Sequence, residues 1–554
     1  MSAAVPAPGT ARPSPGADPS PSGRALRLTP AWTITAALAV VYLLLAPQSP
    51  DLAAASYRSS LFSSAGFTLW DNSWYGGHHL LAYSVLAPAL GALIGPQLLA
   101  ASSMVAATAL FERLLDGCFD SRATRISAAW FALGGSIALL SSRVPFDLGL
   151  AVGLGALLLA RRGRLAPALA VSALTALASP VAGAFLALAF LAWALAGPAR
   201  MRPAMLALAA LAPIGLLTLA FPEGGSQPFV ASAFYPDLVG VLLIGALVRP
   251  LGQTLARRAL GIGVALYALA LAGSYVVPSA VGGNVDRLGA QTAGPVAALV
   301  LVGASRRRRR ALLALAPFLL YWQATAPVTD FASTLSNPSV DASYYTPLLG
   351  ELRALGVGYD ARPARIEVVA TADHWEARYL APHVMIARGW ERQLDTDRNS
   401  IFYDEAEPLT AARYRAWLSA NAISYVALPL HARLDYSARA EARLFAGGHP
   451  PYLREVWRSP DWRLFAVLDA TPLAQAPAML TSASSDSLTL YAPRAGSYMV
   501  RVRFTPYWAL ASGSGCVARA PGEWTDVRAR RAGRVHVVIR FSLARVFSDA
   551  PRCD

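Results

Sequence analysis

The sequence lacks the residues and motifs that mark several common enzyme classes. Only 3 of its 554 residues are cysteine and 7 are histidine, and they form no cluster with the spacing of a zinc site. It contains no phosphate-binding glycine loop, no dinucleotide glycine pattern and no nucleophile elbow. Charged residues make up only 15% of the chain. We therefore predict no zinc site, no ATP-driven mechanism and no ordinary soluble fold.

Apolar residues are abundant instead. They make up 55% of the chain and occur as long runs between short connectors. Some connectors are basic, such as 161–164, 257–258 and the five arginines 306–310. Because basic connectors stay on the cytoplasmic side, this pattern fixes the orientation of a multi-span membrane protein. The same arginines explain the net charge of +15, so we predict no nucleic-acid partner. The connectors of the other kind carry the acids Asp51, Asp71, Asp147, Glu223, Asp237 and Asp286.

The membrane part is predicted to occupy residues 29–325. Residues 1–28 are rich in Ala, Pro, Ser and Gly and are expected to form a disordered cytoplasmic tail. A first helix follows at 31–46. The run 53–55 (Ala-Ala-Ala) leaves a cleaved signal peptide as an alternative, and cleavage there would remove Asp51.

Ten further runs complete a prediction of about eleven transmembrane helices with the N-terminus inside. Leu80–Ile94 is excluded from them as an interfacial or re-entrant helix, because counting it would place 161–164 outside. The ten runs are 97–115, 123–140, 146–160, 165–179, 181–197, 203–221, 235–249, 258–277, 289–304 and 311–325.

The odd number of spans places residues 326–554 outside the cell. We expect an α/β domain at 326–470, with strands at Arg365–Thr371 and Ile423–Leu428 and a helix at Thr410–Asn421. A β-rich domain, a small β-sandwich, is expected at 471–554, with strands at 487–492, 496–506 and 534–543.

The cysteines follow this topology. Cys118 falls in a predicted cytoplasmic connector and should be a free thiol. Cys516 and Cys553 are both exported, and each lacks any other exported cysteine. We therefore predict a disulfide between them.

The first external loop, 47–79, carries most of the candidate chemistry. It begins with Asp51 directly after the first helix and contains Trp74-Tyr75-Gly76-Gly77. Together with the many spans and the exported C-terminal region, these features resemble the GT-C class of membrane glycosyltransferases. The Trp-Tyr-Gly-Gly run is also similar to actinobacterial membrane proteins named 6-pyruvoyl-tetrahydropterin-synthase-related.

The GT-C resemblance implies roles for particular residues. The first-loop acid of that class acts as general base on the acceptor hydroxyl or as a ligand for metal or acceptor. Asp51 matches this position, so a divalent cation is a candidate cofactor. Asp147 matches the second acid of the class. The alternative for Asp51 is a polar residue that simply ends a helix at the membrane interface.

Other polar residues are candidates for substrate binding. Arg143 could bind a lipid phosphate or pair with Asp147. Aromatic rings beside an acid could bind sugar, although Trp and Tyr also anchor membrane interfaces. The remaining candidates are Asp71, Trp74, Tyr75, His78 and His79 in the loop, and Trp375, Glu376 and Arg378 in the exported domain.

These features predict a glycosyltransferase in the cell membrane. It would move a sugar from a polyprenyl-phosphate donor to an external glycan, lipid or protein of the cell envelope. A transporter or flippase is the alternative from another class, but the spans hold few ionisable residues. A catalytically inactive GT-C-like scaffold in envelope assembly is the third hypothesis.

Overall fold

The computed structural model describes residues 29–554 except 249–253, 303, 405 and 554. The predicted tail, residues 1–28, lies outside the described residues. All elements named below belong to the compact unit Ala31–Asp554.

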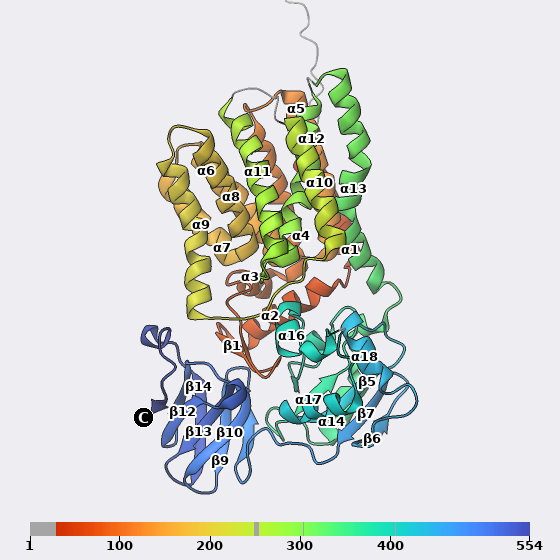
Figure 1. The fold of residues 1–554 in the computed structure, drawn as a ribbon, viewed down its shortest axis with the longest axis vertical. Coiled ribbons are helices and arrows are strands. Elements are labelled where there is room, and N and C mark those ends of the chain that lie inside the picture. Colours follow the sequence, from red (N-terminus) through yellow and green to blue (C-terminus); the bar gives the residue numbers. More distant parts are fainter. Residues whose placement is uncertain (1–28, 249–253, 303, 405, 554) are drawn as a thin grey trace, which may run out of the picture. The chain divides into compact units, whose positions relative to one another are not determined.

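Each of the eleven apolar runs contains one helix, and these helices pack side by side (Figure 1). Small residues let neighbouring helices approach closely: a Cβ atom added to Gly149 would lie 2.6 Å from the Cβ of Ala182. The helices are α1 (Ala31–Leu45), α4 (Pro96–Leu115), α5 (Ser121–Ala138), α6 (Val144–Arg161), α7 (Leu165–Ala178), α8 (Pro180–Ala196), α9 (Met201–Ala220), α10 (Ala231–Val248), α11 (Leu255–Val276), α12 (Asp286–Leu301) and α13 (Arg306–Thr334).

Seven helices in the described part of the chain are long and apolar enough to cross a membrane, or eight if the bent pair α1–α2 is one span. The helices α7 and α8 are apolar but shorter. The helices α1 and α12, with 15 and 16 residues, also fall below the length of about 20 that a span needs. The structure thus supports a helical membrane protein with several spans, and the number eleven stays a prediction.

The segment 47–79, expected to be a loop, contains the helix α2 (Pro50–Ala65) and the two-stranded β1 (Trp70–Asp71) and β2 (His78–His79). Proline in the first turn and Asp51 beside it favour a helix start, and Gly66 at φ 72° ends the helix. The axes of α1 and α2 are bent by 80°. The expectation of a loop was wrong because low hydrophobicity alone does not exclude a helix whose apolar side chains pack elsewhere.

The predicted interfacial run contains only the short helix α3 (Ala87–Ile94), with 8 residues. This length is far below that of a span. The helix α3 packs against α2 and α4.

The α/β unit follows α13 and is built on a five-stranded sheet of order β4-β3-β5-β7-β6. The strands β3, β4 and β5 are parallel neighbours, and β7 and β6 pair antiparallel. The predicted strands and helix of this region correspond to β3, β5 and α17. The elements are α14 (Ala342–Ala354), β3 (Arg365–Val368), α15 (Glu376–Tyr379), β4 (Met385–Ile386), α16 (Arg392–Arg398), α17 (Ala411–Ala420), β5 (Ile423–Pro429), α18 (Arg439–Arg443), β6 (Leu453–Arg458) and β7 (Trp462–Val467).

The last part of the chain forms two four-stranded sheets, β10-β13-β12-β15 and β11-β14-β9-β8 (Figure 1). Apolar side chains of both sheets share one core, as in a sandwich. Cys516 and Cys553 are joined by a disulfide between β12 and β15. The strands are β8 (Met479–Ala483), β9 (Ser487–Ala492), β10 (Gly496–Arg503), β11 (Trp508–Ser512), β12 (Gly515–Arg519), β13 (Trp524–Ala529), β14 (Gly533–Ile539) and β15 (Arg552–Cys553).

The helix α2 shares a hydrophobic core with the α/β unit. Leu52 and Tyr57 of α2 lie in one cluster with Ile366 of β3 and Trp375. Hydrogen bonds reinforce the junction, because the indole N–H of Trp390 donates to the carbonyl of Pro50 at 2.7 Å. The α/β unit therefore fixes the beginning of α2, where Asp51 stands.

Candidate functional site

A cavity of about 1270 Å³, open solvent included, lies between helix ends and the α/β unit. Its wall is built by α6, α8, α9 and α12, by the segments 82–83, 221–224 and 280–284, and by residues 391–394 of the α/β unit. The helices contribute mostly apolar side chains. These are Phe146, Pro180, Val181, Ile214 and Leu217, with Phe221 at the end of α9.

Two arginines stand on this wall. Arg143, directly before α6, donates from Nε to Oδ2 of Asp51 at 3.2 Å, and its Nη2 lies 3.8 Å from Oδ2 of Asp330. Arg287, in the first turn of α12, makes no hydrogen bond or ion pair with any residue that the structure describes. Its guanidinium carbon lies 5.6 Å from the centre of the Phe146 ring. Two guanidinium groups on one cavity, one of them without a carboxylate partner, form a site suited to an anion such as a phosphate.

Asp51 lies behind this arginine pair. It is the second residue of α2, and its side chain is 18% exposed. Its Oδ2 accepts the bond from Arg143, whereas its Oδ1 has no hydrogen-bond partner in the described part of the chain. Asp51 does not itself line the cavity, but Arg143 does, so Arg143 connects the carboxylate to the cavity. The structure brings together Asp51 and Arg143, which are 92 residues apart.

Asp147 is placed differently from the prediction. It is only 2% exposed, lies in the first turn of α6 and does not line the cavity. The ion pair that the sequence suggested between Arg143 and Asp147 is not formed. Arg143 contacts Asp51 and Asp330 instead, because the side chain of Asp147 is enclosed between helices.

The aromatic residues of the predicted first loop are interior residues. Trp74 stacks on Tyr57 of α2 with ring centres 4.7 Å apart, and Tyr75 donates its hydroxyl to the carbonyl of Glu391 at 2.9 Å. Asp71 accepts hydrogen bonds from the Tyr57 hydroxyl at 2.8 Å and from a backbone N–H. All of these side chains are buried and pack α2 against the α/β unit, and substrate binding by them stays a prediction.

The two histidines of this segment are also buried. Burial lowers the pKa of His78 to about 3, and its ring is stacked on Trp74 at 5.4 Å. The ring Nδ1 of His79 lies 2.9 Å from Oε1 of Glu223. Burial alone would raise the pKa of Glu223, but His79 and Arg398 hold it below its ordinary value. His79 therefore fixes the 221–224 wall segment, and neither histidine faces the cavity.

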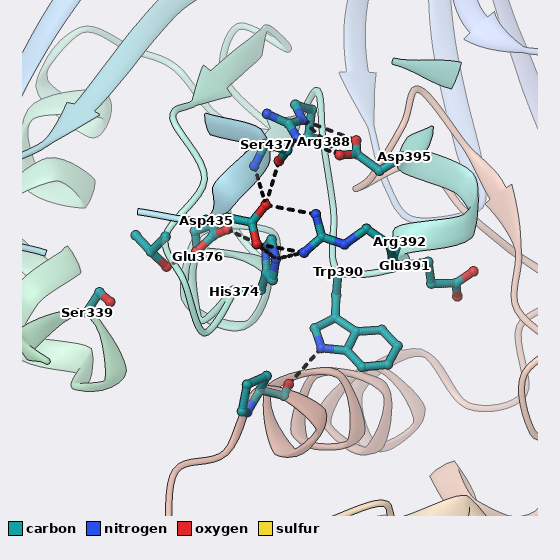
Figure 2. A network of polar contacts seen from close by, with 12 residues as sticks. Ser339, His374, Glu376, Arg388, Trp390, Glu391, Arg392, Asp395, Asp435 and Ser437 are labelled. Carbon is teal, nitrogen blue, oxygen red and sulfur yellow. Dashed lines mark hydrogen bonds and ion pairs between the residues drawn. The ribbon is translucent and has the colours of Figure 1, made fainter. Parts of the chain in front are cut away.

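The three candidates in the α/β unit also lie off the cavity wall. Trp375 is buried and donates its indole N–H to the carbonyl of Gln48 at 3.0 Å. Glu376 is buried in a polar network with His374, at 3.1 Å, which Figure 2 shows. The guanidinium of Arg378 lies over the ring of Tyr379 at 5.9 Å. Trp375 and Glu376 thus have structural contacts, and Arg378 is remote from the cavity.

Sequence reasoning missed several wall residues. Glu391 and Tyr83 are not among the predicted site residues. Tyr83 lines the cavity, with Arg58 4.3 Å from its ring centre and the Trp390 ring 5.6 Å away. Arg287 is also not among the predicted site residues. The signal that could have found it is an arginine beside an apolar run on the side predicted to be external.

No group of three or more His, Cys, Asp or Glu side chains that could hold a metal ion occurs among the described residues. Asp51, the acid that the resemblance offers as a metal ligand, is paired with an arginine. The structure therefore gives no ligand set on which to build a divalent-cation site.

No protein-family model matches this sequence, and no curated protein matches it significantly. Among solved structures, the chain is similar to the archaeal oligosaccharyltransferase AglB from Archaeoglobus fulgidus, in complex with an inhibitory peptide and a dolichol-phosphate. The two chains are 12% identical, with a TM-score of 0.42, over 72% of this chain and 69% of that chain. At this level of likeness, the functional assignment depends on the side chains of this chain itself.

Proposed function

We propose that this protein is a membrane glycosyltransferase of the GT-C kind that uses a polyprenyl-phosphate-linked sugar as donor. The observation that carries the proposal is the cavity with Arg143 and Arg287 on one wall and apolar helix residues around them. A phosphate attached to an isoprenoid chain combines the two chemistries that this cavity offers. The apolar wall suits the chain, and the guanidinium groups suit the phosphate.

Arg143 and Arg287 would both bind the phosphate group, each with a different part of its contacts still free. Arg143 uses Nε for Asp51, and its Nη2 lies 3.8 Å from Asp330, which leaves Nη1 able to contact an anion in the cavity. Arg287 can bind the phosphate without giving up any other ion pair. During transfer the bond between the anomeric carbon and the phosphate oxygen breaks, and the lipid phosphate keeps the electron pair. The two arginines then stabilise the negative charge that develops on the leaving phosphate.

Asp51 is the proposed general base. The acceptor hydroxyl loses its proton to the free Oδ1 of Asp51 as its oxygen forms the new bond to the anomeric carbon. The ion pair with Arg143 keeps the base in place beside the phosphate. Asp147 receives no catalytic role in this proposal, because it is only 2% exposed, whereas the side chain of Asp51 is 18% exposed and is joined to the cavity wall by Arg143.

The proposed location follows from the charge pattern of the sequence. The N-terminus is inside, and the α/β unit and the two-sheet unit are outside the plasma membrane. The partners are then the lipid bilayer, a polyprenyl-phosphate-linked sugar, and a glycan, lipid or protein acceptor of the cell envelope.

The test is sugar transfer by the purified protein in lipid vesicles. Asp51→Asn should remove turnover by about 10²–10⁴-fold, because this is the range that general base catalysis contributes. Asp147→Asn, assayed at equal amounts of folded protein, should keep turnover near that of the wild type.

The opposite pattern, with Asp51→Asn active and Asp147→Asn inactive, would contradict the proposed base. A flippase would move labelled lipid across the bilayer without cleaving the bond between sugar and phosphate. An inactive scaffold would cleave nothing with any donor.

A further inference from the structure

The cavity is lined by polar side chains as well as by the apolar side chains of its helices. Gln393 of the α/β unit and Asn284, before α12, both line it. Neither side-chain amide makes a hydrogen bond with any described residue. Glu391 lines it as well; its Oε1 pairs with Arg58, and its Oε2 has no partner in the described part of the chain. These groups supply hydrogen-bond donors and acceptors that no part of the described chain uses.

A rigid network holds the segment that carries Glu391 and Gln393. Arg388 donates from Nη2 to Asp395 at 2.6 Å, and Arg392 donates from Nη2 to Asp435 at 2.6 Å. Figure 2 shows Arg392 pointing toward Asp435, while Glu391 points away from that network. Bidentate arginine–carboxylate contacts of this kind fix geometry as well as charge.

Trp390 ties the same segment to the proposed base. Its indole N–H donates to the carbonyl of Pro50, the residue before Asp51. Glu391, Gln393 and the base are therefore positioned by one segment of the α/β unit.

The loop after α9 also contacts the segment that carries Glu391 and Gln393. Thr396 donates its hydroxyl to the carbonyl of Ser226 at 3.2 Å. Gly225, at φ +90°, comes so close that a Cβ atom there would lie 1.9 Å from the carbonyl oxygen of Gln393. Only glycine fits this contact, so the approach of the loop to Gln393 is fixed by the sequence.

We propose that Gln393, Asn284 and Glu391 bind the hydroxyl groups of a neutral sugar on the lipid-phosphate donor. This inference rests on the proposed function and adds the class of sugar and the residues that select it. Amides donate to and accept from hydroxyls, and the free oxygen of Glu391 accepts from them. Gln393 and Asn284 carry no charge, Glu391 is already paired with Arg58, and Arg143 and Arg287 are assigned to the phosphate. No free cation is then left among the described residues of the cavity wall for the carboxylate of a sugar acid, so the site selects neutral sugars over uronic acids.

The experiment compares two lipids in the full-length protein in nanodiscs. One, the bare lipid phosphate, is a C55 polyprenyl methyl phosphate, a diester with the same single charge as the sugar-bearing lipid. The other carries a glucosyl, mannosyl, galactosyl or arabinosyl unit in place of the methyl group. The wild type should bind at least one neutral sugar-bearing lipid about 5-fold or more tighter than the bare lipid, since each hydrogen bond is worth a few-fold. A glucuronosyl lipid should show no such gain.

Gln393→Leu is the decisive variant, because Gln393 has no side-chain partner whose loss would destabilise the fold. It should reduce the gain from the sugar by about 2- to 10-fold and leave the bare lipid phosphate unaffected. Gln475→Ala is the matched control; Gln475 accepts a hydrogen bond within the two-sheet unit and does not line the cavity. It should change neither affinity.

Two results would overturn the inference: no neutral sugar improves binding to the wild type, or Gln393→Leu keeps the full gain. Failure of the proposed function looks different, because the bare lipid phosphate would then not bind the wild type. That result would overturn the inference as well.

Discussion

Replacing Arg287 by alanine tests the phosphate site with little risk to the fold. Arg287 makes no hydrogen bond or ion pair with any described residue, so its removal leaves no acid without a partner. The contact that is lost is the one with the Phe146 ring at 5.6 Å. Such a contact is worth about 0.5–1 kcal/mol at an exposed site and about 2 kcal/mol when desolvated, and the half-buried Arg287 lies between these limits. We therefore expect the Arg287→Ala protein to melt within a few degrees of the wild type.

The effect on phosphate binding should be much larger. A hydrogen bond between charged groups contributes about 1.5–3 kcal/mol, and about 1.4 kcal/mol corresponds to a tenfold change in affinity. Arg287→Ala should therefore raise the Kd for a polyprenyl phosphate by about 10–150-fold. The uncharged polyprenol, which lacks the phosphate, should bind both proteins equally.

The assay is a binding titration of both lipids by purified protein in detergent or nanodiscs. Arg378→Ala is the matched control, because Arg378 also lacks an ion pair in the described part of the chain but does not line the cavity. It should leave both affinities unchanged. The assignment of the phosphate site would be refuted if both variants lost the same affinity for polyprenyl phosphate, or if Arg287→Ala lost none.

Two further predictions concern pH and topology. Burial lowers the pKa of His374, but its contacts with Asp435 and Glu376 outweigh burial and raise the pKa to about 9. The protonated His374 therefore stabilises the fold fully below about pH 6.5, and this stabilisation is lost as the pH rises through about 9. The difference in melting temperature between the wild type and His374→Gln should shrink over that pH range. A difference that stays constant with pH would contradict this prediction. In fusion experiments, a reporter active only in the cytoplasm should work after Arg310, and one active only outside should work after Tyr344; a cytoplasmic Tyr344 would reverse the orientation.

Elements with a clear local pattern were predictable from the sequence. Each apolar run holds a helix, and the strand predicted at 487–492 is β9. The helix α2 was missed, because its few apolar residues become a core face only when the α/β unit packs on them. Local pattern does not contain that information.

The site was predictable only in part, for the same reason. Asp51 and Arg143 were each singled out, but their contact joins positions 92 residues apart. Trp74 beside polar residues looks the same in sequence whether it binds a sugar or fills a core, and the structure shows that it is buried. Gln393 ends the polar, aromatic run 388–393, which could line a carbohydrate groove or pack under a loop. The run does not single out Gln393, because its place on the cavity wall depends on how α16 and the loop after α9 meet.

A structure of the protein with bound polyprenyl phosphate tests the central claim most directly. The account predicts that the phosphate lies within hydrogen-bonding distance of the guanidinium groups of both Arg143 and Arg287, beside Asp51, with the isoprenoid chain along Ile214 and Leu217. A phosphate bound elsewhere, with Arg143 and Arg287 unoccupied, would contradict it.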